Sequence, residues 1–218
     1  MQPDYYSHKL YPLQDQVLKV LQKSKTQFYL TGGTALSRVW LKHRYSDDLY
    51  FFMNRSDRFK EEVALMAERL TQEFPGALQR LIDTSEFHRW LLSQNEVELK
   101  IELINDVSYR HGQITATKLF FRTDHPLNIL SNKISALSRN EAKDVADILF
   151  LDEAFDFSWP EMIEHAKQKD LSVNEIEVAN TLGNYDVRLL ESVRWVERPD
   201  FDWCSERLHA MARRIVEA

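Results

Sequence analysis

The stretch FYLTGGTAL, residues 28–36, joins a short apolar run to a helical pattern through two adjacent glycines. The apolar run predicts a β-strand that ends directly before Gly32 and Gly33, and the helical pattern resumes at Thr34. Glycine allows a close backbone approach, and the amides of such a turn can bind an anion together with the N-terminus of the next helix. A tight turn in which Thr34 caps the helix explains the same residues, and this stretch taken alone slightly favours that simpler interpretation.

The next predicted strand, Leu49 to Met53, follows the stretch HRYSDD (43–48) and raises a question about metal binding. Asp48 and Tyr50 are two residues apart, so in a strand both side chains project from one face. A phosphoryl-transfer site is expected to have a second carboxylate at the position of Tyr50. These residues alone fit an active enzyme with an altered metal site, a disabled enzyme or an ordinary strand.

A third strand is predicted at 97–103, where apolar and polar residues alternate. Its polar face has Glu98, Lys100 and Glu102, and by itself it fits a half-buried strand with a solvated face. If this strand lies beside Asp48, carboxylates from the two strands can converge on a hard cation such as Mg²⁺, which prefers oxygen ligands.

Two later segments carry charges beside apolar positions of predicted helices. In NKISALSR (132–139), Lys133 borders the apolar face, and KDVAD (143–147) opens the next helix. An amphipathic pair of helices with local charge pairing is the simpler interpretation. A lysine directed into a cleft can instead bind a phosphate as a compact point charge.

The bulk properties are those of an ordinary globular chain, with 218 residues and a formal net charge of -6. This charge argues against a strongly basic surface for non-specific nucleic-acid binding, although it permits a local basic cleft. The single cysteine, Cys204, cannot form an internal disulfide and fits a reducing compartment. The sequence shows neither an apolar signal core nor an apolar run of about 18 residues, so we predict a cytoplasmic protein with no membrane partner.

The order of predicted elements indicates an α+β protein. A mixed part of helices and strands occupies residues 1–125, and a helical part follows in residues 126–218. The other predicted elements are helices at 12–25 and 59–74, a hairpin of strands at 87–92 and 97–104, and a strand at 114–121.

Four motifs occur in order along the chain: YLTGGTAL (29–36), HRYSDDL (43–49), NKISALSR (132–139) and KDVADI (143–148). Together they resemble the AbiEii-type nucleotidyltransferases, the toxin half of bacterial abortive-infection and toxin–antitoxin systems. The resemblance covers roughly residues 27–151. It implies a fold related to the polymerase β superfamily, a small mixed sheet flanked by helices with catalytic carboxylates on its strands, on which the helical C-terminal part packs.

The resemblance implies transfer of a nucleoside monophosphate from an NTP to a hydroxyl acceptor, for which RNA is a candidate, with loss of pyrophosphate. It also implies Mg²⁺ or Mn²⁺ as the cofactor and a cognate antitoxin as a partner. Carried over position by position, it assigns metal binding to Asp48 and Glu102, phosphate contact to Lys133, and completion of the cleft to Asp144 or Asp147. It assigns nucleotide binding to Gly32, Gly33, Thr34 and Ser46.

Tyr50 departs from the family pattern, because it stands where the family has its second aspartate. A neutral phenol is a poor ligand for Mg²⁺, whereas the glycine turn and Lys133 are intact. We therefore weigh three interpretations: a nucleotidyltransferase whose activity is reduced or lost, a catalytically silent module that binds nucleotide, RNA or a partner protein, and an inactivating change at position 50 of a toxic enzyme. We expect Asp48, Tyr50 and Glu102 to face one cleft, with the glycine turn at its rim.

Overall fold

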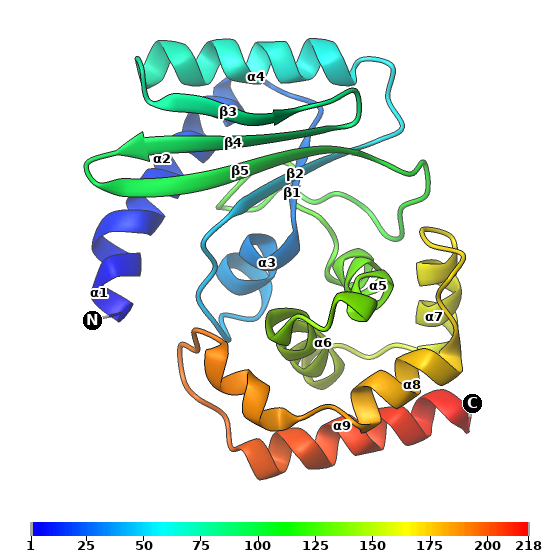
Figure 1. Cartoon of the computed structure of the whole chain (residues 1–218). Helices are drawn as coiled ribbons and strands as arrows, with labels where there is room; N and C mark the ends of the chain where they lie inside the picture. The colour runs from blue at the N-terminus through cyan, green and yellow to red at the C-terminus, as the bar shows by residue number, and fades with distance from the viewer. Residues whose placement is uncertain (1, 218) are drawn as a thin grey trace.

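The computed structural model describes residues 2–217 and places five strands in one mixed sheet (Figure 1). The strand order is β1-β2-β5-β4-β3, in which β2 and β5 run parallel and the other neighbours run antiparallel. The strands are β1 (Tyr29–Thr31), β2 (Leu49–Asn54), β3 (Leu78–Asp83), β4 (Phe87–Gln94) and β5 (Val97–Asp106). Together with the helices described below, this sheet confirms the predicted α+β class.

Two long helices cover the apolar face of the sheet. They are α2 (Tyr11–Lys23), which continues α1 (Gln2–Tyr5) and η1 (Tyr6–Leu10), and α4 (Phe59–Glu73). Alternation along β5 turns Leu99, Ile101 and Leu103 into the core, where all three are fully buried. Lys100 and Glu102 consequently face the other side of the sheet.

The helical half of the chain lies on that other side (Figure 1). The short helices α3 (Gly32–Ala35) and η2 (Leu36–Trp40), which follow β1 directly, lie on this side as well. The later elements are α5 (Pro126–Ser135), η3 (Leu137–Arg139), α6 (Ala142–Ala154), α7 (Trp159–Lys167), α8 (Glu175–Gly183), η4 (Val187–Ser192) and α9 (Phe201–Val216). Within residues 2–217, no helix combines the length and the apolar character needed to span a bilayer.

The secondary structure differs from the prediction in two places. The strand predicted at 114–121 is wrong: the segment is irregular, because a turn closed between Thr117 and Phe120 folds it back and leaves isolated bridges at Thr115 and Thr123. β3 is an edge strand that the sequence pattern does not indicate. Its residues are mostly exposed, Leu81 included, so it lacks the buried alternating face that identifies a strand.

Candidate active site

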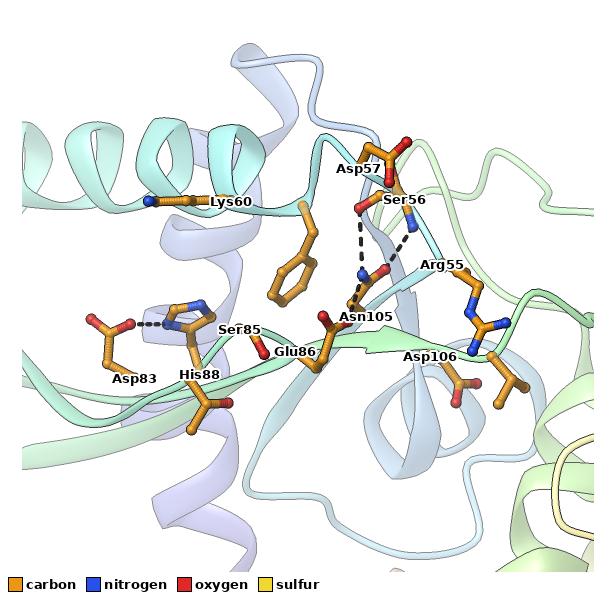
Figure 2. A pocket seen from close by; sticks show the side chains of 13 residues that line it. Arg55, Ser56, Asp57, Lys60, Asp83, Ser85, Glu86, His88, Asn105 and Asp106 are labelled. Atoms are coloured by element: carbon orange, nitrogen blue, oxygen red, sulfur yellow. Dashed lines mark hydrogen bonds and ion pairs between the residues drawn. The ribbon is translucent and has the colours of Figure 1, made fainter.

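A wide cleft of about 930 Å³ opens where β2 and β5 end (Figure 2). Arg55, His88 and Asp106 are among its lining residues, and the side-chain amide of Asn105 donates a 2.7 Å hydrogen bond to Glu86 across it. The residues that the sequence assigns to catalysis or nucleotide binding lie elsewhere, near the start of β2 and the middle of β5. The candidate active site therefore lies around the start of β2 and not in this cleft.

The parallel pairing of β2 with β5 brings Asp48, Tyr50 and Glu102 together. Tyr50 is directly opposite Glu102 in the register, and Asp48 precedes β2 by one residue. Gly32 lies against the same group: a Cβ added there would be 3.4 Å from Tyr50 Cδ2. Its φ of +67° is a conformation that glycine adopts without strain, which explains the residue type at this turn. The structure thus groups these residues as expected, while their roles in catalysis stay predictions.

Lys100 and Arg89 complete this cluster, and neither is among the site residues that the sequence predicts. The Lys100 ammonium lies 2.8 Å from Asp48 Oδ2 and 3.7 Å from Glu102 Oε1. Arg89 Nε donates a 2.7 Å hydrogen bond to Glu102 Oε1 from the neighbouring strand β4. The signal for Lys100 was present in the alternation of β5, but its pairing with Asp48 depends on the β2–β5 register, which a single sequence does not reveal.

Tyr50 remains a neutral phenol in this surrounding. Burial raises its pKa above the usual range, and the nearby carboxylates of Asp48 and Glu102 raise it further. Its hydroxyl donates a long hydrogen bond of 3.4 Å to Asp48 Oδ2. The side chain therefore offers a metal ion no anionic oxygen.

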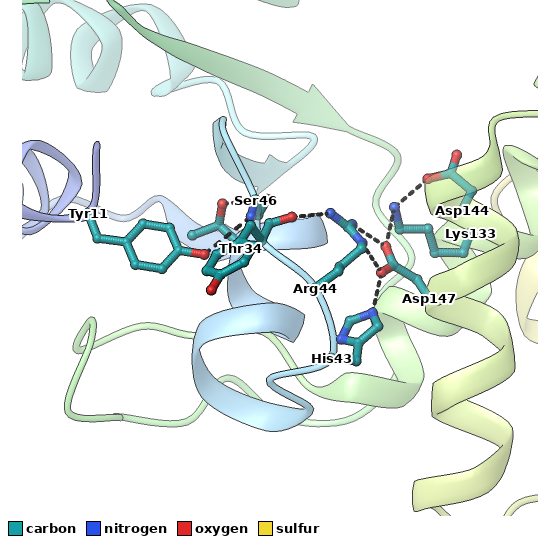
Figure 3. A network of polar contacts seen from close by, with 9 residues as sticks. Tyr11, Thr34, His43, Arg44, Ser46, Lys133, Asp144 and Asp147 are labelled. Carbon is teal, nitrogen blue, oxygen red and sulfur yellow. Dashed lines mark hydrogen bonds and ion pairs between the residues drawn. The ribbon is translucent and has the colours of Figure 1, made fainter. Parts of the chain in front are cut away.

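A second, buried network joins the loop before β2 to helices α5 and α6 (Figure 3). Asp147 is at its centre and accepts two 2.7 Å hydrogen bonds from the Arg44 guanidinium and one of 2.8 Å from His43 Nε2. The Lys133 ammonium contacts Asp147 Oδ2 at 2.8 Å and Asp144 Oδ1 at 2.5 Å. Asp147 is fully buried and has cationic or imidazole partners on both oxygens, so its evident role is to hold these elements together.

The ionisation of this network follows from charge pairing that outweighs desolvation. Burial alone would raise the pKa of Asp147, but Arg44 and Lys133 hold it well below its usual range. Burial alone would lower the pKa of Lys133, but Asp147 and Asp144 raise it. Burial lowers the pKa of His43, which favours the neutral imidazole. Asp147 and Lys133 are therefore a charged pair in the folded protein.

The residues predicted to bind the nucleotide are tightly packed around the start of α3. Gly33 is required by a close approach, because an added Cβ would lie 2.5 Å from Arg44 Nη2 and 3.0 Å from Ser46 Oγ. The Thr34 hydroxyl contacts Ser46 Oγ at 3.0 Å and also the carbonyl oxygen of Asp48. These bonds fix the loop that carries Asp48. Nucleotide binding by Thr34 and Ser46 stays a prediction.

The arrangement does not fit a divalent cation. Among the described residues, the two networks pair four carboxylates with four cationic side chains: Asp48, Glu102, Asp144 and Asp147 with Arg44, Arg89, Lys100 and Lys133. No group of three or more His, Cys, Asp or Glu side chains within residues 2–217 is placed to hold a metal. Asp48 and Glu102, the two predicted metal ligands, both contact the Lys100 ammonium instead.

The mixed sheet with its helical C-terminal half is the fold of nucleotidyltransferases. The structure is similar to MenT4, a nucleotidyltransferase toxin from Mycobacterium tuberculosis, with a TM-score of 0.65, 13% identity and coverage of 100% of this chain and 86% of that one. It is also similar to JHP933 from Helicobacter pylori, with a TM-score of 0.61, 18% identity and coverage of 96% and 93%. At these identities the likeness establishes the fold alone.

The sequence identifies the family. The family model described as "Nucleotidyl transferase AbiEii toxin, Type IV TA system" matches residues 16–213. The chain therefore belongs to the AbiEii family of nucleotidyltransferase toxins of type IV toxin–antitoxin systems, and the suspected resemblance is confirmed. Membership implies an NTP substrate, typically a divalent metal, and a cognate antitoxin. No curated protein shows significant sequence similarity to the chain.

Proposed function

We propose that this chain binds a nucleoside triphosphate beside the Gly32–Gly33 turn and, as it stands, transfers the nucleoside monophosphate to a hydroxyl acceptor at a very low rate. One observation carries the proposal: the neutral Tyr50 side chain lies beside Asp48 and on the strand position opposite Glu102, where transfer needs a further carboxylate. Nucleotidyl transfer relies on charge stabilisation around the phosphates, and this cluster has no carboxylate without a cationic partner among its described residues.

In this proposal the core in residues 1–125 supplies the glycine turn, and the helical part in residues 126–218 supplies Lys133. Gly32 lies directly against Tyr50, so a triphosphate at this turn would also reach the Asp48 cluster. Lys133 would have to loosen one of its two carboxylate contacts to bind phosphate. Asp144 is the weaker anchor of the two, since it has fewer partners than Asp147.

We propose RNA as the acceptor, because a basic groove lies on the surface of the core formed by residues 1–125. The groove has a volume of about 910 Å³ and lies between α2, η2 and residues 117–119. Its cationic residues are Lys19, Lys23, Arg38, Lys42 and Lys118. Asp15 also lines the groove and pairs with Arg38 at 2.6 Å, so the charged residues of the lining carry a net charge of +4. In a chain with a net charge of -6, this excess gives a local field that suits a polyanion.

The test of the proposed function is a transfer assay on this chain and on Tyr50→Asp. Each protein is incubated with Mg²⁺, each labelled NTP in turn and total RNA. We expect little or no product from the chain as written and clearly more from Tyr50→Asp, because the substitution restores a charged oxygen ligand beside Asp48. Each factor of ten in rate corresponds to about 1.4 kcal/mol of transition-state stabilisation.

The matched control is Asp48→Asn in the Tyr50→Asp background, which should abolish the gain. Robust transfer by the unaltered chain, with no increase in Tyr50→Asp, would contradict the proposal and show that the second carboxylate is dispensable or comes from another position. Asp47 and Glu98 are the first alternatives to test. A chain that binds no NTP at all would leave the silent partner-binding module as the better interpretation.

A further inference from the structure

We propose that Lys100 is the resident cation of this site, so that its ammonium takes the place between Asp48 and Glu102 that a divalent ion would need. The ammonium is 2.8 Å from one carboxylate oxygen and 3.7 Å from the other. A Mg²⁺ bridging the same oxygens would require distances of about 2.1 Å to each. The ion and the ammonium therefore compete for the same small volume and for the same negative charge.

The fold holds Lys100 in this position. The β2–β5 register pairs Leu49 with Ile101 and Tyr50 with Glu102, which aligns Lys100 with Asp48 directly before the start of β2. The side chain of Lys100 is about one-third exposed and that of Asp48 about one-fifth. The pair is therefore partly buried, and an ion from solution can still reach it. The ammonium also lies 5.9 Å from the centre of the Tyr50 ring.

Tyr50 and Lys100 both make the charge of the site more positive than it would be with an aspartate at position 50 and a neutral residue at position 100. Tyr50 removes one negative charge that an aspartate would supply, and Lys100 adds one positive charge. With both residues present, the four carboxylates and four cations of the region balance. With Asp at position 50 and a neutral residue at position 100, the region would have a formal charge of -2, which matches one divalent ion.

The experiment measures Mn²⁺ binding without nucleotide, by electron paramagnetic resonance of free Mn²⁺ and by calorimetry. The proteins are the unaltered chain, Tyr50→Asp, Lys100→Met and the double variant Tyr50→Asp/Lys100→Met. We expect no saturable binding to the unaltered chain and one site in the double variant, at least about tenfold tighter than in either single variant. Lys60→Met, which removes an exposed lysine of α4, is the control and should leave Mn²⁺ binding unchanged.

Melting temperatures, measured once in EDTA and once with Mn²⁺ in place of EDTA, distinguish a local loss of charge pairing from misfolding of a variant. Lys100→Met leaves Asp48 without its close cationic partner and should lower the melting temperature, and Mn²⁺ should restore it in the double variant. The proposal is overturned if the unaltered chain binds Mn²⁺ as tightly as the double variant and loses it in Asp48→Asn. It is equally overturned if a folded double variant binds no Mn²⁺. Neither outcome depends on NTP binding or transfer, so the proposed function is judged separately.

Discussion

At the scale of single residues, Lys133 and Asp147 differ in their burial and in the number of their charged partners. Both belong to motifs of the family, yet Asp147 is fully buried with every close partner drawn from the protein, whereas Lys133 shares its ammonium between two carboxylates. Burial and charged partners therefore account for Asp147 as a support of the fold, whereas a phosphate contact by Lys133 stays a prediction.

Lys133→Ala should weaken NTP binding by about 1.5–3 kcal/mol, the range for a hydrogen bond to a charged group. The measurement is calorimetric titration with NTP, made after unfolding curves have shown that the variant is folded. Lys143→Ala on the adjacent helix is the control and should bind NTP as the unaltered chain does. Equal NTP affinity of Lys133→Ala and the unaltered chain would remove Lys133 from the nucleotide site.

Asp147→Asn should lower the free energy of unfolding by about 3–5 kcal/mol, because it leaves the buried charges of Arg44 and Lys133 without their shared counter-ion. Denaturant unfolding gives this value. Asp144→Asn is the comparison and should cost less, since Asp144 pairs with Lys133 alone among these cations. A smaller loss for Asp147→Asn than for Asp144→Asn would show that the network around Asp147 is not a main support of the fold.

At the scale of elements, the irregular segment 107–125 contacts α7 through a tilted pair of imidazole rings, His111 and His165. The His111 ring lies 3.9 Å from that of His165 and 6.2 Å from that of His125, measured between ring centres. Burial lowers the pKa of His111, and the neighbouring His165, His125 and Lys169 lower it further, against an opposing effect of Glu161. Burial and Arg110 lower the pKa of His125. The folded state thus favours the neutral rings of His111 and His125.

The free energy of unfolding should consequently decrease as the pH is lowered through the range in which His111 takes up a proton. The unfolded chain takes up protons near the ordinary histidine pKa of about 6.5, whereas the folded chain resists them until lower pH. Melting temperatures measured from pH 7.5 to 5 should therefore drop less steeply for His111→Gln than for the unaltered chain. Other titrating groups are common to both proteins and cancel in the difference. Parallel curves would show that His111 has the same pKa folded and unfolded.

The elements also show where sequence patterns succeed. Alternation in 97–103 predicts β5 and its two faces correctly. The apolar residues are buried in the core, and Glu98, Lys100 and Glu102 face the other side of the sheet, where Glu102 is also buried. The family motifs locate Gly32, Asp48 and Lys133 in the region that the structure brings together. The pattern does not indicate β3, whose exposed residues have no buried face, and it does not indicate the partners of Lys100 and Arg89. Their contacts depend on which strands are neighbours, a tertiary property that local periodicity does not encode.

At the scale of the whole molecule, charge is distributed unevenly. The formal net charge is -6, and the nucleotide site is balanced, yet the groove between α2, η2 and residues 117–119 gathers lysines and an arginine. A local excess of positive charge of this kind can steer a polyanion to the groove. The groove is thus the natural place to test whether RNA is the acceptor.

Lys19→Gln/Lys23→Gln should weaken RNA binding and make it less sensitive to salt. Each lost phosphate contact lowers the slope of log affinity against log salt by about 0.7–0.9, so two lysines should lower it by roughly 1.5. Fluorescence anisotropy of labelled RNA, measured at several KCl concentrations between about 50 and 200 mM, gives both quantities. Lys9→Gln/Lys60→Gln removes the same charge from exposed positions outside the groove, and it should leave the slope unchanged. Equal losses in the two double variants would mean that RNA responds only to total charge and that the groove is not its binding surface.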